Sequence, residues 1–402
     1  MICESHHCFK ASRGGDSMLQ EHQTKASLLE VCLVFLRLGT LSFGGPAAHI
    51  AMMEDEFVQK RQWLERGKFL ELVGASNLIP GPTSTELAIY IGYLKAGWPG
   101  LIGAGVFFIL PAMLIVLFLA HIYVLYGELP QVSFALYGVK PVIVAIIAQA
   151  IWNLGKTAVK DVPSGLIGGM ALGLSFFVVN PLFLLMLSGV AMIAIKRAHK
   201  IKMNVFFAPL LALVDVTKNE AAQAAAGAKL SLAALFVTFF KIGAVLYGSG
   251  YVLLAFLWKD FVQNYQVLTS QQLLDAVAIG QVTPGPVFTT ATFIGYVIAG
   301  IPGAIVATIA IFLPSFVFVP VISIFLSKIK NSAIASDFLA GVIVASLALM
   351  ASVTWTLAMS SVIDWLTALL AMLSCIAIFK YRVNTTWLIF GGGAIGIVQF
   401  LF

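Results

Sequence analysis

One stretch of the sequence occurs twice, and this repetition limits the fold more than any other feature. Residues 35–111 recur about 204 positions later as residues 239–314, with one residue lost on the way. The strongest match aligns Asn77-x-x-Pro80-Gly81-Pro82 with Gln281-x-x-Pro284-Gly285-Pro286. Related halves fused in one apolar chain are typical of membrane transporters.

Charged residues and glycines outside that motif follow the same spacing. The matched pairs are Arg37 with Lys241, Glu56 with Asp260, Glu71 with Asp275 and, after the lost residue, Gly138 with Gly341. Cations matched with cations and acids matched with acids indicate that the two halves share one arrangement of charge.

The composition is that of a polytopic membrane protein. The chain has 402 residues, of which 60% are hydrophobic and 10% are charged, whereas a soluble domain has about 25% charged residues. In a protein embedded in a lipid bilayer, the net charge of +6 indicates basic loops on the cytoplasmic side. No nucleic-acid partner is expected.

The first 25 residues form a polar N-terminal tail without the features of a signal peptide. Cys3 and Cys8 bracket His6 and His7, but no further cluster of ligands accompanies them. We therefore expect neither a metal site nor a cofactor.

The sequence predicts an all-α fold in which each half has about five spans and one broken hairpin. The apolar segments long enough to cross a bilayer are 27–46, 98–122, 132–154, 163–180, 181–196, 230–256, 302–327, 336–357, 361–379 and 385–402. In two further stretches, 69–94 and 272–299, Pro-Gly-Pro interrupts the helix. We interpret these as hairpins that enter and leave the membrane on one side.

The distribution of basic residues predicts that the second half is inverted relative to the first. With five spans per half, 16 Lys and Arg residues lie on one side of the membrane and 4 on the other. An odd number of spans turns the second half over. The predicted domains are a tail (1–25), a first repeat (26–196), a cytoplasmic linker (197–229) and an inverted second repeat (230–402).

Several linked motifs resemble the chromate transporter family in its fused, two-domain form. The strings that carry the resemblance are Phe43-Gly44-Gly45-Pro46, Ile79-Pro80-Gly81-Pro82-Thr83, Gly280-Gln281-Val282-Thr283-Pro284-Gly285-Pro286 and Gly248-Ser249-Gly250-Tyr251. The resemblance covers nearly all of residues 27–402. It implies a bacterial inner-membrane protein that moves chromate outward and confers chromate resistance, with sulfate as a competing or alternative substrate.

A dianion at membrane depth needs cations or oriented donors, and Arg37 and Lys241 are the matched cations within apolar helices. Each could instead neutralise an acid, with Glu71 the expected partner of Arg37 and Asp275 that of Lys241. Both interpretations stay open, because substrate could displace the acid. Lys140 has no matched cation; it could flank the substrate path or reach toward the membrane interface, and we favour the second interpretation.

The Pro-Gly-Pro hairpins supply the second predicted element of an oxyanion site. Thr83-Ser84-Thr85-Glu86 has a capping-box pattern, so free N–H groups at the start of that helix could bind an anion. The further side chains expected to contact substrate are Asn77, Gln281, Thr283 and Thr289. Gly44, Gly45, Gly248 and the Pro-Gly-Pro residues (Pro80, Gly81, Pro82, Pro284, Gly285 and Pro286) are assigned to shape, and Glu71, Asp275 and Glu86 to ion pairing or proton coupling.

Other functions are weighed against a secondary transporter. An oxyanion channel or a sulfate uptake transporter would use the same residues. An intramembrane enzyme acting on an anionic lipid would need a nucleophile beside a base, and the sequence has no such pattern. A second copy of the chain is the one protein partner considered.

Overall fold

The computed structural model describes residues 26–43, 45–127, 129–177, 180–197, 230–247, 250, 252–330 and 332–401, leaving out the side chains of residues 324–330. All regular structure within these residues is helical, which confirms the predicted class. The predicted tail, nearly all of the predicted linker, and Gly44 and Gly248 lie outside the described residues.

The helices follow the same order in both halves. The first half contains α1 (Leu28–Leu41), α2 (Gly45–Glu54), the π-helix η1 (Asp55–Lys60), α3 (Arg66–Ser76), α4 (Thr83–Tyr126), α5 (Pro130–Ala158), α6 (Val162–Ser175) and α7 (Pro181–Arg197). The second contains α9 (Leu232–Val245), α10 (Leu253–Leu257), the π-helix η3 (Trp258–Asn264), α11 (Ser270–Val282), the 3₁₀-helix η4 (Val287–Thr289), α12 (Thr290–Lys330), α13 (Ala333–Ser361), α14 (Trp365–Phe379) and α15 (Thr385–Leu401). α1 thus corresponds to α9, α3 to α11, α4 to α12 and α5 to α13.

Four helical segments are long and apolar enough to cross a membrane. They are 83–126, 130–158, 287–323 and 333–361, and the predicted spans 98–122, 132–154, 302–327 and 336–357 fall on them. The apolar helices α6, α7, α14 and α15 have only 14 to 17 residues. A total of ten spans therefore stays a prediction.

The first helix of each half is shorter than the apolar segment predicted there, 27–46 or 230–256. α1 ends at Leu41 and α9 at Val245, and each has 14 residues. Such a helix rises about 21 Å, less than the roughly 30 Å of a hydrocarbon core. The chain then turns extended, and Gly45 takes a φ of 80°, which an α-helix does not allow.

α4 and α12 each fold back on themselves at an Ala-Gly pair. Gly97 has φ 63° and ψ −149°, and Gly300 has φ 63° and ψ −152°, a conformation that favours glycine. Beyond this turn the two legs of α12 pack side by side, since Thr292 Oγ1 lies 2.7 Å from Thr308 Oγ1. The repeat therefore preserves a backbone turn as well as side chains.

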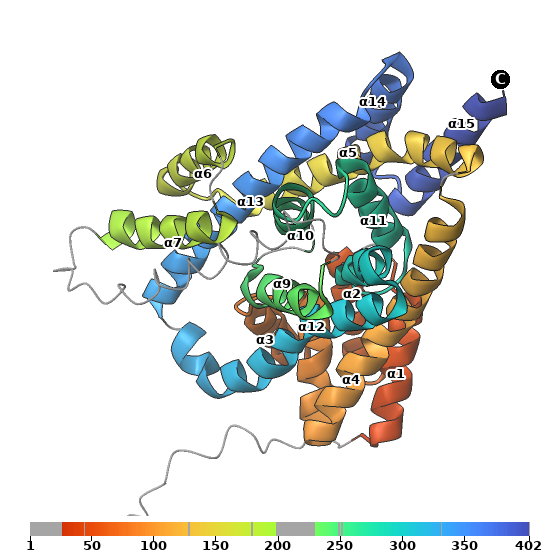
Figure 1. Cartoon of the computed structure of the whole chain (residues 1–402). Helices are drawn as coiled ribbons and strands as arrows, with labels where there is room; N and C mark the ends of the chain where they lie inside the picture. The colour runs from red at the N-terminus through yellow and green to blue at the C-terminus, as the bar shows by residue number, and fades with distance from the viewer. Residues whose placement is uncertain are drawn as a thin grey trace, which may run out of the picture.

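The two halves exchange helices (Figure 1). α5 of the first half packs against α14 and α15 of the second, while α13 of the second packs against α6 and α7 of the first. A Cβ on Gly138 would meet the carbonyl of Gly392, and one on Gly341 would meet the carbonyl of Ser188. Glycine lets these helix backbones touch, as is common in membrane helix pairs.

These contacts are reciprocal, and reciprocal contacts define a pseudo-two-fold axis. α4 and α12, which correspond to one another, also pack directly against each other. The repeated sequence has therefore produced two halves related by rotation about one axis.

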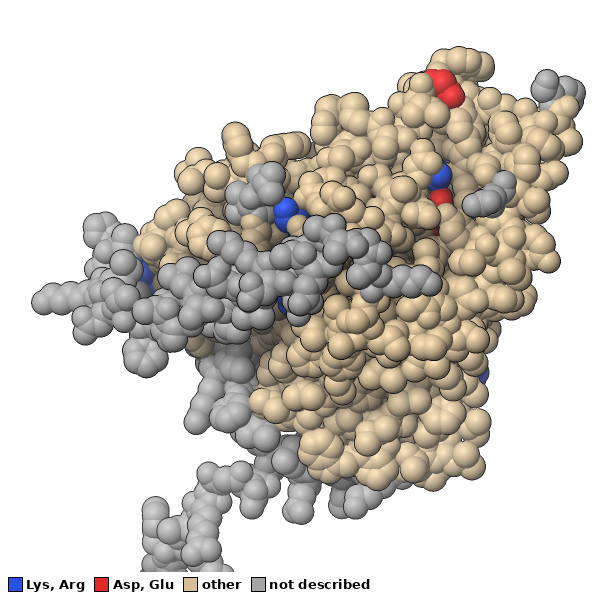
Figure 2. Space-filling model, in the orientation of Figure 1, with Lys and Arg blue, Asp and Glu red and all other residues tan. Residues whose placement is uncertain are grey.

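The surface matches a bilayer environment. Outside the grey atoms, the face in Figure 2 carries only isolated charged residues. Large apolar side chains are exposed on several helices, including Phe118 of α4, Met170 of α6 and Trp355 of α13. A soluble monomer rarely exposes so much apolar surface to water. In a membrane, lipid chains cover this surface and keep it away from water.

The short helices α6 and α14 begin at matched capping boxes. Asp161 accepts a hydrogen bond from the Ser164 N–H, and Asp364 accepts one from the Thr367 N–H. Lys196 lies 2.8 Å from Asp161. Hydrogen bonds from Lys196 and Ser164 hold the pKa of Asp161 well below its usual range.

Candidate functional site

The two Pro-Gly-Pro tips meet the opposite halves at the pseudo-two-fold axis. α3 ends at Ser76 and α4 begins at Thr83, so the predicted helix break at the first motif is confirmed. The Gly81 N–H donates to the Leu246 carbonyl at 2.8 Å, and the Gly285 N–H donates to the Ser42 carbonyl, also at 2.8 Å. Each tip thus satisfies the open end of the other half's first helix.

Both tip glycines have conformations and neighbours that exclude a side chain. Gly81 has φ 137° and Gly285 has φ 90°. A Cβ on Gly285 would lie 2.8 Å from Ala112 Cβ, and one on Gly81 would lie 2.8 Å from Ser315 Oγ. Ala112 and Ser315 are themselves equivalent in the repeat. The predicted role of these glycines in shape therefore has a direct geometric basis.

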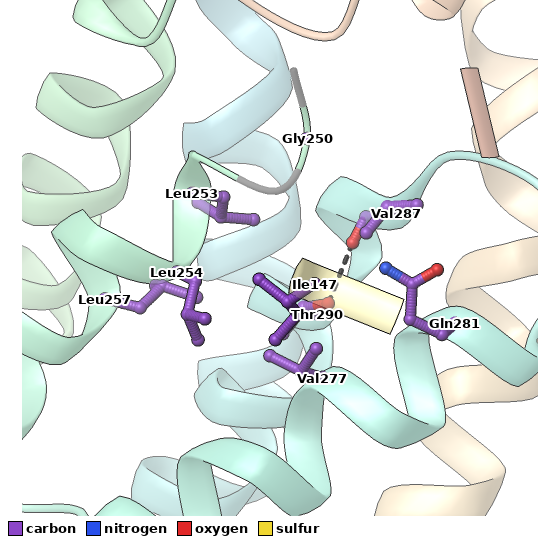
Figure 3. Close-up of a pocket in the computed structure, with 9 residues that line it drawn as sticks. All are labelled: Ile147, Gly250, Leu253, Leu254, Leu257, Val277, Gln281, Val287 and Thr290. Atoms are coloured by element: carbon purple, nitrogen blue, oxygen red, sulfur yellow. Dashed lines mark hydrogen bonds between the residues drawn. The ribbon is translucent and has the colours of Figure 1, made fainter. Parts of the chain in front are cut away.

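A pocket lies beside the second tip (Figure 3). It is lined by α5 of the first half and by α10, α11 and the start of α12, and its cavity volume is about 10 Å³. Its lining residues are Ile147, Gly250, Leu253, Leu254, Leu257, Val277, Gln281, Val287 and Thr290. Gln281 and Thr290 supply its polar side chains, and no charged residue of the described chain lines it.

Of the predicted contact residues, only Gln281 lines this pocket. Thr283 donates its hydroxyl proton to the Ile279 carbonyl at 2.7 Å, and Thr289 donates to the Pro286 carbonyl at 2.8 Å. A hydroxyl has one proton, so neither can also donate to an oxyanion in this conformation. Asn77 lies exposed at the end of α3, away from its buried counterpart Gln281.

The predicted capping box at the start of α4 is wrong. The N-cap is Pro82, one residue earlier than the pattern suggests, so Glu86 falls beyond the position from which it could bond back to the cap. Glu86 is instead fully buried. Its Oε1 accepts from the Ser315 hydroxyl at 3.3 Å, and its Oε2 has no hydrogen-bond partner among the described residues.

Ser84, a predicted contact residue, bonds to a histidine that sequence reasoning did not assign to the site. His49 of α2 is buried, with Nδ1 3.2 Å from Ser84 Oγ and Nε2 3.1 Å from the Ser42 carbonyl. A carbonyl only accepts, so Nε2 carries a proton, and in the neutral ring Nδ1 then accepts from the Ser84 hydroxyl. His49 thereby supports the carbonyl that also binds Gly285. Its repeat counterpart is Leu253, so the repeat itself offers no signal for it.

The predicted partners of the two matched cations are wrong. Arg37 pairs with Glu56 at 2.6 Å and Lys241 pairs with Asp260 at 3.0 Å. Both acids lie in the π-helices, and each pairs with the first helix of its half, Glu56 with α1 and Asp260 with α9. The matched pair Glu56 and Asp260 in the repeat was the signal that could have identified these partners.

The acids first assigned to those cations bind elsewhere. Glu71 pairs with Lys68 of its own helix at 3.1 Å, one turn away. Asp275 pairs with Lys140 at 3.4 Å and accepts a hydrogen bond from the Tyr123 hydroxyl at 2.9 Å. Lys140 therefore points into the contact between α5 and α11, and its expected extension toward the interface is wrong.

The arrangement defines a class of protein: an integral, multi-pass membrane protein of two related halves that meet at broken helices, as transporters do. The sequence profile described as Chromate transporter matches residues 29–193 and again residues 233–397. The chain belongs to the chromate transporter family, which makes it a transporter and not an enzyme.

Individual relatives agree with this assignment. The chain is 33% identical to a chromate transport protein of Cupriavidus metallidurans, over 93% of this chain and 94% of the relative. It is also 33% identical to a probable chromate transport protein of Synechococcus elongatus, over 92% and 94%. The uncharacterized transporter YwrA of Bacillus subtilis is 30% identical over 38% of this chain and 88% of its own length. No solved structure matches the chain.

Proposed function

We propose that this protein is a secondary transporter that exports chromate across the bacterial inner membrane, with sulfate as a competing or alternative substrate. The observation that carries the proposal is the family membership of both halves, which meet at reciprocal Pro-Gly-Pro tips. The printed names of the two long relatives supply the substrate class. Sulfate follows from its shared shape and charge.

Export needs no ATP on energetic grounds. The membrane potential is worth about 2.3 kcal/mol per charge per 100 mV. A dianion leaving a negative interior therefore gains about 4.6 kcal/mol, equivalent to a gradient of roughly a thousandfold. Uptake of sulfate would need a coupled cation. Glu86 is our candidate for a coupled proton, because it is fully buried with only a hydroxyl bonded to it.

The test is flux through the purified full-length protein in liposomes. We expect saturable chromate transport, stimulation of labelled chromate entry by chromate on the far side, and a direction that follows an imposed potential. Sulfate should compete. A flux that neither saturates nor shows counterflow would identify a channel, and a flux of sulfate alone would identify a sulfate transporter.

We further propose that the repeats 26–196 and 230–402 are inverted, with the linker 197–229 in the cytoplasm. The support is the uneven distribution of basic residues and the pseudo-two-fold axis, which would then lie in the membrane plane.

Labelling of single cysteines checks this topology. We expect cysteines at Tyr126 and Asn264 to react from outside the cell, and cysteines at Glu65, Asp215 and Lys330 to react only from the cytoplasm. Reaction of the Glu65 and Asn264 positions from one and the same side would exclude inversion, because these positions lie in the equivalent segments that precede the two hairpins.

The substrate path in this proposal runs between the hairpin tips. Gln281 would donate from the pocket, and Asn77, Thr83 and Ser84 would contact the oxyanion once the tips separate. Thr283 and Thr289 would contact it after their hydroxyls release the carbonyls of Ile279 and Pro286. Arg37 and Lys241 would then serve the path only after releasing Glu56 and Asp260.

A further inference from the structure

The hairpin helices α3 and α11 are equivalent in sequence, yet they are packed differently. α11 contacts α5 and α13, whereas α3 makes no comparable contact with either helix among the described residues. Leu70 of α3 is 54% exposed, while its counterpart Leu274 of α11 is 0% exposed. The two halves therefore share one fold, but the equivalent helices α3 and α11 are packed differently within it.

A charged cluster holds α11 in its packed position. Lys140 of α5 and Tyr123 of α4, both from the first half, bind Asp275 of α11 in the second half. The Lys140 and Asp275 side chains are 15% and 4% exposed. Their distance of 3.4 Å is longer than the 2.7–2.9 Å of a strong charge-assisted hydrogen bond. A pair of this length can hold α5 and α11 together and can also break when the two helices move apart.

The other half lacks this link between halves. The counterpart of Lys140 is Ile343, and Glu71, the counterpart of Asp275, binds Lys68 within α3. The second half thus adopts the same fold with the hydrophobic residue Ile343 at the position that Lys140 occupies in the first half. Burying an ion pair costs desolvation that an apolar residue avoids, so a pair present at one end alone points to a role beyond packing.

We propose that Lys140, Asp275 and Tyr123 form a gate that closes one end of the substrate path, while the end beside α3 is open. Exchanging the positions of α3 and α11 across the pseudo-two-fold axis generates the opposite state, with α3 packed and α11 released. This inference rests on the proposed transport function. In the proposed topology the closed end faces outside, so the structure represents the state that accepts substrate from the cytoplasm.

Cysteine accessibility at equivalent positions tests the gate. Gly74 of α3 and Ala278 of α11 are equivalent; a Cβ on Gly74 meets no atom within 4 Å, while Ala278 is 4% exposed. We expect Gly74→Cys to react with an impermeant maleimide from the cytoplasmic side about tenfold faster than Ala278→Cys reacts from outside, because a minor state is populated at about 10% or less. The full chain, with Cys3, Cys8, Cys32 and Cys375 changed to serine, serves as the background.

Breaking the gate should shift both rates in opposite directions. With Lys140→Gln, Ala278→Cys should react several-fold faster and Gly74→Cys several-fold slower. The charge swap of Lys140→Asp with Asp275→Lys should return both rates toward those of the parent, which a lysine that merely binds substrate would not do. Lys68→Gln is the matched control, since it removes an ion pair confined to α3, and should change neither rate.

Three outcomes would overturn the gate. The first is equal reactivity of the two cysteines in the parent protein, and the second is unchanged rates after Lys140→Gln. The third is a Gly74→Cys that reacts only after dissociation into monomers, which would show that a second copy covers α3. Because labelling needs no substrate, absent chromate flux with the expected labelling pattern would reject the transport proposal alone, and normal flux with symmetric labelling would reject the gate alone.

Discussion

Replacing either tip glycine by leucine, Gly81→Leu or Gly285→Leu, is expected to abolish chromate transport. The native φ values of 137° and 90° are strained for any residue with a Cβ. The added atoms would also collide with Ser315 or Ala112 of the opposite half. Strain of about 1–3 kcal/mol from the backbone and a similar amount from overpacking would separate the tips.

Flux in liposomes and the amount of protein in the membrane are the measurements for this prediction. Gly169→Leu is the control, because Gly169 lies on α6 with open space around it, and both flux and protein level should stay normal. Unchanged transport in both tip variants, at normal protein level, would show that the reciprocal contact is dispensable.

Lys241→Gln is expected to destabilise the protein far more than the equivalent change Arg37→Gln. Loss of Lys241 leaves the buried carboxylate of Asp260 with a hydrogen bond from the Asn264 amide at 3.1 Å and the charge of the neighbouring Lys259. Stranding a buried charge costs about 3–5 kcal/mol. Arg37 is half exposed, and without it Glu56 keeps a second arginine.

That second arginine is Arg61, whose Nε lies 2.7 Å from Glu56 Oε1. The matched position in the second half is Tyr265, which carries no charge. The two equivalent ion pairs should therefore contribute unequally to stability. Thermal unfolding of each variant in detergent measures the stability lost.

The double variant Lys241→Gln with Asp260→Asn separates structural pairing from substrate binding. A pair that serves only the fold should recover both stability and chromate flux when both charges are removed. If Lys241 also binds the oxyanion, stability returns but flux does not. Full recovery of flux would remove Lys241 from the substrate path.

Much of the architecture could be predicted because the repeat is visible in the sequence. The helix break at Pro-Gly-Pro follows from backbone chemistry, and the Ala-Gly turns of α4 and α12 fall at the predicted boundaries near residues 97 and 300. The long apolar helices follow from the length of their apolar segments alone. These features depend on local sequence, so one sequence is enough to predict them.

Features set by distant contacts could not be predicted in the same way. Glu56 and Asp260 lie in π-helices and pair with the first helix of each half, and no residue pattern marks the wider turns of a π-helix. Helix exchange between the halves depends on which apolar faces meet, whereas a sequence shows only that such faces exist. The unequal packing of α3 and α11 does not follow from the sequences of these two helices, because matched residues such as Leu70 and Leu274 occupy both.

The exchange of helices has a consequence for how the protein is made. A ribosome completes α5 at Ala158, but its packing partners α14 and α15 are made only between Trp365 and Leu401. Gly138 is therefore synthesised long before Gly392, whose backbone it contacts in the folded protein. A premature stop after Phe379 would delete only α15 from the second half, yet it would remove one of the two helices against which α5 of the first half packs.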